Sequence, residues 1–177
     1  MRTLASACCL LAFAWSDSAQ PPKPPEEARV SLAELQFLIG EWEGALEFVD
    51  PAVDRAKRKV AATFVCKKIP EALEYRFTYV DAQGKKVEED LAKAAPAEGG
   101  ARVQFGPDLW RVTRKTVDAP AGRVEIAFAR DGMENSKPAE FRRTVVSSGQ
   151  TLVIKTESKP EKSDEWSVRT EYSLKKK

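Results

Sequence analysis

The chain has 177 residues, the length of a single domain, since one hydrophobic core usually divides only beyond about 250 residues. Its 29 basic and 27 acidic residues leave a net charge of +2, which is too small to attract nucleic acid or an anionic lipid surface. It contains no histidine, which excludes Ser-His-Asp and Cys-His nucleophilic sites, His-bearing zinc sites and His-ligated haem.

The first 19 residues have the pattern of a secretory signal peptide. Arg2 provides a positive start, residues 4–15 form a mostly apolar run, and small residues follow at Ser16, Ser18 and Ala19. The apolar run is shorter than the about 20 residues that a membrane-spanning helix needs, so we expect cleavage and no transmembrane segment. The sequence therefore predicts an exported protein, either periplasmic or secreted.

Residues 20–30 contain four prolines and no apolar periodicity, which is typical of an extended linker. Directly after it, Ser31 and Glu34 have the spacing of a capping box, and apolar residues such as Leu35 and Leu38 follow. This pattern predicts a short helix that ends near Gly40. We expect the folded domain to occupy residues 31–177.

Beyond this helix, apolar and polar residues alternate with the period of two that is typical of strands with one buried face. The predicted strands cover residues 41–48, 58–69, 73–79, 86–92, 102–105, 109–117, 123–130, 140–147, 151–158 and 165–174. Short turns separate them, including those at 81–84 and 131–132. About ten strands with short connections predict an all-β fold, an antiparallel up-and-down β-barrel closed at one end by the short helix.

After removal of the signal peptide, Cys66 is the last remaining cysteine, so no disulfide within the chain is expected. Cys66 shares the apolar phase of its predicted strand with Phe64. Free cysteines are among the most buried residue types, so we expect Cys66 in the core.

Residues 35–44, with the sequence LQFLIGEWEG, carry a resemblance to a known family. This run resembles the opening of lipocalin-like (calycin) proteins, in which a short helix leads through Gly-x-Trp into the first strand. It is most similar to a bacterial lipocalin-like family of unknown function and, more distantly, to the nitrobindins. The resemblance implies that Gly40 and Trp42 close one end of the barrel. It also implies that a basic side chain near the last strand packs over Trp42, for which Arg169 and Lys175 are the local candidates and neither is assigned.

Nitrobindins hold haem through a histidine, and this chain has none, so we expect no cofactor. The acidic run Glu88, Glu89 and Asp90 is expected to bind no metal, because neighbouring strand residues point to opposite faces and cannot converge on one ion.

Several polar residues share the phase of inward apolar residues: Arg143 lies in phase with Phe141 and Val145, Arg114 with Trp110 and Val112, and Tyr172 with Trp166 and Val168. An inward arginine is costly unless it is paired. We hypothesise that Arg143, with Arg114 and Tyr172 as lesser candidates, binds the carboxylate of an apolar ligand inside the barrel, as in fatty-acid carriers. Tyr75 and Phe77 of the third predicted strand belong to the same ligand-binding face. The alternative is that Arg143 lies at the barrel mouth or is neutralised by Glu89.

Two functions remain open at this stage. The first is a non-catalytic module that binds a small hydrophobic ligand, and the second is a structural or protein-interaction barrel filled by its own side chains. A connected cavity of at least about 300 Å³ would favour the first. A His-free enzyme that uses Arg143 and Tyr172 is a third reading without any further signal in the sequence, so we expect no enzyme.

Overall fold

The computed structural model describes residues 28–49, 56–81 and 83–177, so the predicted signal peptide and most of the predicted linker lie outside the described residues. In chain order the elements are η1 (Ala33–Leu38), β1 (Gly40–Val49), β2 (Lys57–Ile69), β3 (Ala72–Val80), β4 (Lys86–Glu88), β5 (Ala92–Ala97), η2 (Glu98–Gly100), β6 (Arg102–Phe105), β7 (Asp108–Asp118), β8 (Arg123–Glu134), β9 (Lys137–Ser148), β10 (Thr151–Pro160) and β11 (Ser167–Lys176). No helix in these ranges is long and apolar enough to cross a membrane.

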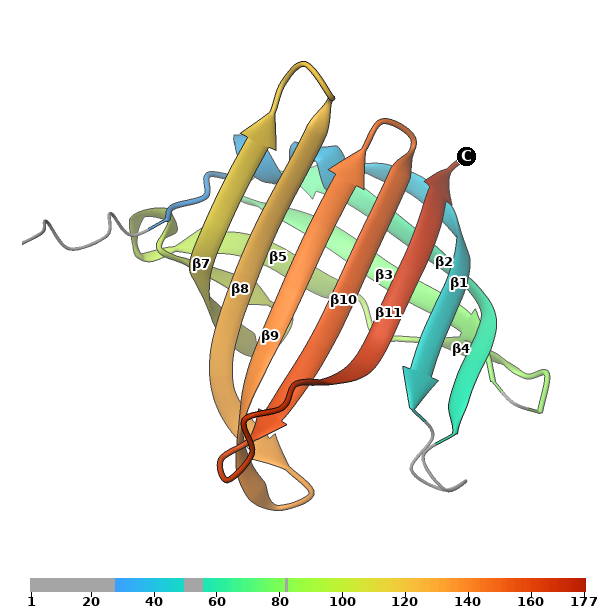
Figure 1. Ribbon diagram of the computed structural model, residues 1–177. Helices are drawn as coiled ribbons and strands as arrows, with labels where there is room; N and C mark the ends of the chain where they lie inside the picture. Colours follow the sequence, from blue (N-terminus) through green and yellow to red (C-terminus); the bar gives the residue numbers. More distant parts are fainter. Residues whose placement is uncertain (1–27, 50–55, 82) are drawn as a thin grey trace, which may run out of the picture.

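The strands form one antiparallel sheet that closes on itself. β1 pairs with both β2 and β11, and β2 also pairs with β3, while β4 pairs with β3 alone and stays outside the ring. The other strands follow one another around the barrel, as Figure 1 shows. The predicted all-β, up-and-down barrel is therefore confirmed, with β4 as an additional strand. Closure leaves the ring without exposed edges.

The strand boundaries differ from the prediction at several places. Of the predicted strand 86–92, residues 86–88 form β4, while β5 begins at Ala92 and continues through residues 93–97, for which no strand was predicted. β3 pairs with β4 near Val80 and with β5 near Leu73. The predicted turn at 131–132 lies inside β8, and the chain reverses instead at Asn135 and Ser136. These two residues have φ of 49° and 62°, the left-handed conformation of a tight hairpin turn, which Asn tolerates better than most residues.

The core follows the predicted alternation in the first strands. Trp42 and Leu46 of β1 are buried, and so are Phe64 and Cys66 of β2. Burial raises the pKa of the Cys66 thiol to about 12, which keeps it protonated.

The predicted short helix is present as the 3-10 helix η1, and it lies across one end of the barrel (Figure 1). Its capping box forms: the Ser31 N–H donates to Glu34 at 2.9 Å, and the Glu34 N–H donates to the Ser31 hydroxyl at 3.3 Å. Lys115 of β7 binds the same glutamate at 2.7 Å, which fixes the helix to the barrel wall. Val30, one residue before the predicted start of the domain, is already part of the core.

Candidate ligand-binding site

An inner cavity of about 250 Å³ lies inside the barrel. Its walls come from β2, β3, β6, β9, β10, β11 and η1 and from the segment after β4. The residues that line it are Leu38, Phe64, Tyr75, Phe77, Glu89, Phe105, Arg143, Val145, Ile154, Thr156, Thr170 and Tyr172. Leu38 belongs to η1, so this end of the cavity is covered by the helix. The lining is mainly apolar with a few polar groups, which is the usual composition of a small-molecule site.

A wider cavity of about 610 Å³ adjoins the first and shares Glu89, Thr170 and Tyr172 with it. Its other lining residues include Asn135 of the β8–β9 turn, which lies at the end of the barrel opposite η1 (Figure 1). We call this wider cavity the mouth. The inner cavity alone is smaller than the about 300 Å³ typical of ligand sites, and only the two cavities together exceed it.

Arg143 of β9 faces the inner cavity, as the sequence predicts. Its Nε donates to Thr156 Oγ1 at 3.3 Å, and its guanidinium lies 4.6 Å from the ring centre of Trp110 and 5.5 Å from that of Phe105. Burial lowers the pKa of Arg143, but an arginine stays protonated inside a protein even so. No carboxylate of the described chain forms an ion pair with it. Arg143 is thus a half-buried cation that lines a mainly apolar cavity.

A second inward arginine, Arg130 of β8, was not predicted from the sequence. Its guanidinium lies 4.9 Å from the ring centre of Trp110 and 4.6 Å from that of Phe141, and it forms an ion pair of 3.3 Å with Asp108. The signal was available, because Arg130 shares its phase with the fully buried Phe128. Asp108 forms its ion pair with Arg130 and also attracts Arg143 from a greater distance, so Arg143 is the inward arginine without a carboxylate at ion-pair distance in the described chain.

A row of aromatic side chains from β2, β3 and β11 forms one wall of the inner cavity. The ring centres of Phe64 and Phe77 are 4.6 Å apart and those of Phe77 and Tyr172 are 4.3 Å apart, while Tyr75 lies 5.9 Å from both Phe64 and Phe77. The predicted site residues Tyr75, Phe77 and Tyr172 are therefore brought together with Arg143 around one cavity.

The two tyrosines of this row remain protonated. Burial raises the pKa of Tyr75, and burial together with the nearby Glu89 carboxylate raises the pKa of Tyr172. The Tyr172 hydroxyl donates to Glu89 at 3.2 Å, so Glu89 is engaged by a tyrosine and forms no ion pair with Arg143. Phenols held in this state serve as hydrogen-bond donors.

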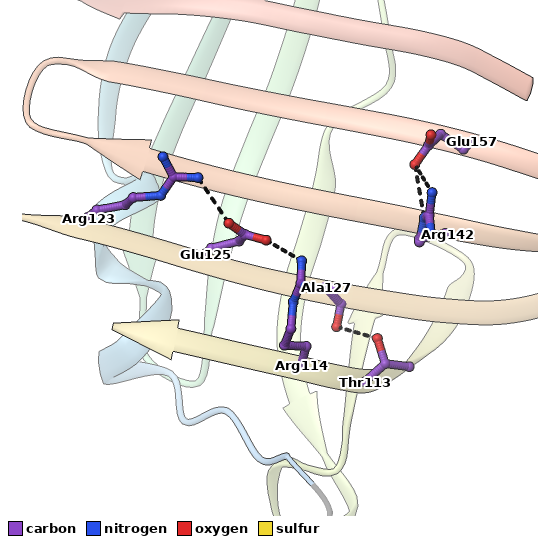
Figure 2. A network of polar contacts seen from close by, with 7 residues as sticks. All are labelled: Thr113, Arg114, Arg123, Glu125, Ala127, Arg142 and Glu157. Carbon is purple, nitrogen blue, oxygen red and sulfur yellow. Dashed lines mark hydrogen bonds and ion pairs between the residues drawn. The ribbon is translucent and has the colours of Figure 1, made fainter. Parts of the chain in front are cut away.

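Arg114, the second predicted carboxylate ligand, does not reach the cavity. A β-bulge at Thr113 inserts one extra residue into β7, so Val112 faces inward and Arg114 outward. Figure 2 shows Arg114 on the outer face, where it pairs with Glu125, which Arg123 also contacts at 3.0 Å. The inward placement of Arg114 was wrong because a bulge reverses the two-residue alternation.

Gly40 and Trp42 close the end of the barrel beneath η1. The Trp42 indole is fully buried and donates to the Leu38 carbonyl at 3.0 Å. The basic side chain over Trp42 is Lys176, at 5.4 Å from the ring centre and directly opposite Trp42 in the β1–β11 ladder. Gly40 has a φ of 134°, and a Cβ there would lie only 3.0 Å from the Lys176 side chain. Neither basic residue considered from the sequence occupies this place.

Of those two, Arg169 points to the mouth instead. It pairs with Glu134 and donates to Ser158 at 2.6 Å. Lys175 is the register partner of Glu43, one position away from the Trp42 pair, and is exposed. Only the strand pairing reveals that Lys176 is the residue opposite Trp42.

No protein-family model matches the chain, and no curated protein matches it. Among solved structures, the chain is similar to the crystal structure of Rv2717c from M. tuberculosis, with a TM-score of 0.60 and 14% sequence identity. The similarity covers 82% of this chain and 96% of that chain. At this level of identity the likeness shows the fold alone, a β-barrel of similar extent.

Proposed function

We propose that this protein is a non-catalytic binding module for a small apolar ligand that carries a carboxylate. The observation that carries the proposal is the guanidinium of Arg143, which faces an apolar cavity without a carboxylate partner among the described residues. A half-buried charge in mainly apolar surroundings is costly without an ion-pair partner, so the site gains most from a ligand that brings the opposite charge.

The geometry of Arg143 suits a carboxylate. Because Thr156 accepts the hydrogen bond from Nε, the two terminal nitrogens are left for a ligand. A carboxylate can accept two parallel hydrogen bonds from an arginine, and such charged pairs are among the strongest hydrogen bonds in proteins. The protonated hydroxyl of Tyr75 offers a further donor in the same cavity.

The rest of the proposal follows the resemblance of the opening segment to lipocalin-like barrels. Proteins of this shape enclose one small ligand inside the ring of strands. The signal-like N-terminal segment supports export to the periplasm or the medium. Ligand binding inside the ring and export are thus both proposed on the basis of the sequence.

A structural or protein-interaction barrel is the second candidate, and the small volume of the inner cavity favours it. With about 250 Å³, the inner cavity holds a short ligand or the head of a longer one that extends into the mouth. A protein that never binds a small acid in this cavity would belong to the second class.

Titration with a fluorescent fatty acid tests the proposal. We expect the exported protein to bind it, and Arg143→Gln to weaken binding by roughly tenfold to a hundredfold, since a charged hydrogen-bonded pair contributes about 1.5–3 kcal/mol. Arg114→Gln is the matched control, because it removes the same charge from the outer face and is expected to leave the affinity unchanged. Equal binding by the wild type and Arg143→Gln would refute the role of Arg143.

A further inference from the structure

Glu89 lies at the boundary between the inner cavity and the mouth. It lines both cavities, and it belongs to the segment 89–91 that separates β4 from β5. Its backbone N–H donates to the Phe77 carbonyl at 3.0 Å, and its side chain accepts the hydrogen bond of Tyr172 at 3.2 Å. The Glu89 side chain is exposed, and the hydrogen bond from Tyr172 holds its carboxylate where the two cavities meet.

The charged groups on the two sides of this boundary have opposite signs. Within the described ranges, no lysine or arginine forms an ion pair with Glu89. Arg169, the basic residue that lines the mouth, is already engaged by Glu134 and Ser158. A ligand that passes this point therefore meets one cation, Arg143, on the inner side and one uncompensated carboxylate, Glu89, on the way out.

We propose that Glu89 restricts the site to ligands with a single anionic group, an inference that rests on the proposed role of Arg143. The mouth offers room for a ligand longer than the inner cavity, and such a ligand runs from Arg143 past Glu89, because the two cavities share Glu89, Thr170 and Tyr172. A neutral tail passes Glu89 without an electrostatic cost. A second carboxylate on that tail meets a like charge, and this repulsion opposes binding by an amount that the solvent around the exposed Glu89 reduces.

The test compares fatty acids with dicarboxylic acids of the same length. Octanoate, decanoate and dodecanoate, and the corresponding α,ω-dicarboxylates, are titrated by displacement of a bound fluorescent fatty acid. The proteins are the wild type, Glu89→Gln, Glu88→Gln and Arg143→Gln. Glu88→Gln is the matched control, since Glu88 is the neighbouring residue, is exposed, and pairs with Arg76 and Lys86 outside the cavity.

We expect the wild type to bind each dicarboxylate roughly tenfold more weakly than its monocarboxylate, a ratio that a like-charge contact readily produces. Glu89→Gln should remove most of this difference, while Glu88→Gln should retain it. If the ratio is near one in the wild type, or is unchanged in Glu89→Gln, the selective role of Glu89 is wrong.

The two proposals fail in different ways. If monocarboxylates bind in a manner that depends on Arg143 but the ratio does not depend on Glu89, the proposed function stands and the inference about Glu89 falls. If the wild type binds none of the acids, or Arg143→Gln binds them equally well, both fall together.

Discussion

The arginines of this barrel differ in the groups that surround and compensate their charge. Arg114 and Arg142 lie on the outer face, and each is paired with a glutamate (Figure 2). Arg130 faces inward and is paired with Asp108. Arg143 has aromatic rings and one hydroxyl around it instead. This contrast is why a binding role is assigned to Arg143 and not to the other three.

A substitution of the single residue Lys176 tests how the closed end of the barrel is stabilised. Lys176→Met keeps the length of the side chain but removes the charge above Trp42, so it should lower the free energy of unfolding by about 0.5–1 kcal/mol, the value of a cation–π contact at an exposed site. Urea denaturation measures this change. Lys175→Met, on the neighbouring outward position, is the control and should have a smaller effect. Equal effects of both substitutions would mean that the contact with Trp42 contributes nothing.

At the scale of elements, one of the interactions that hold η1 on the barrel depends on pH. Hydrogen bonds from Lys115 and Ser31 lower the pKa of Glu34 from 4.5 to about 2. Because the pKa is lower in the folded state, the contribution of Glu34 to stability is fully present above pH 4.5 and is lost as the pH falls towards 2.

Glu34→Gln should therefore destabilise the protein at neutral pH and have little effect at pH 2. The Glu34 side chain is 40% exposed, so solvent screens the ion pair and the expected loss is only about 0.5–1 kcal/mol. Urea denaturation of both proteins between pH 7 and pH 2 measures the difference. A difference that stays constant over this range would contradict the assignment.

The bulge in β7 leads to a prediction about chain length. With Thr113 removed, Val112 would still face inward and Arg114 would still lie opposite Ala127, so the register would be retained. We expect this deletion to cost about 1 kcal/mol, mainly the hydrogen bond from Thr113 to Ala127.

Deletion of Thr144 is the matched comparison, since Thr144 lies opposite the same Ala127 on the other side, in a ladder without a bulge. Removing it shifts the inward residues of β9 to the outer face, so this variant should lose several kcal/mol or fail to fold. Circular dichroism and urea denaturation compare the two deletions. Similar losses for both would show that Thr113 is not a spare residue.

The bulge also explains how far the sequence predicts the site. The alternation in β1, β2 and β3 correctly places Trp42, Phe64 and Phe77 inside, because these strands pair without irregularity. It places Arg143 correctly for the same reason, and it fails for Arg114 because no residue type marks a bulge. The contact between Lys176 and Trp42 depends on which residues face each other across strands, and this pairing is not encoded in the pattern of one strand.

At the scale of the whole molecule, closure of the ring shields the interior from solvent. Cys66 lies in this interior, and burial raises the pKa of its thiol to about 12. Iodoacetamide should therefore alkylate Cys66 in the native protein only through opening of the barrel, and at a much higher rate in urea. Mass spectrometry of the peptide that contains Cys66 follows the reaction. Rapid alkylation without denaturant would contradict a closed and stable ring.

The central claim is that the barrel holds a carboxylate on Arg143, and a crystal structure of the protein with bound decanoate tests it most directly. We predict that the decanoate carboxylate lies within hydrogen-bond distance of the terminal nitrogens of Arg143, with the chain directed past Glu89 to the mouth. Decanoate bound in the opposite direction, or bound outside the barrel while the inner cavity remains free of it, would contradict the claim.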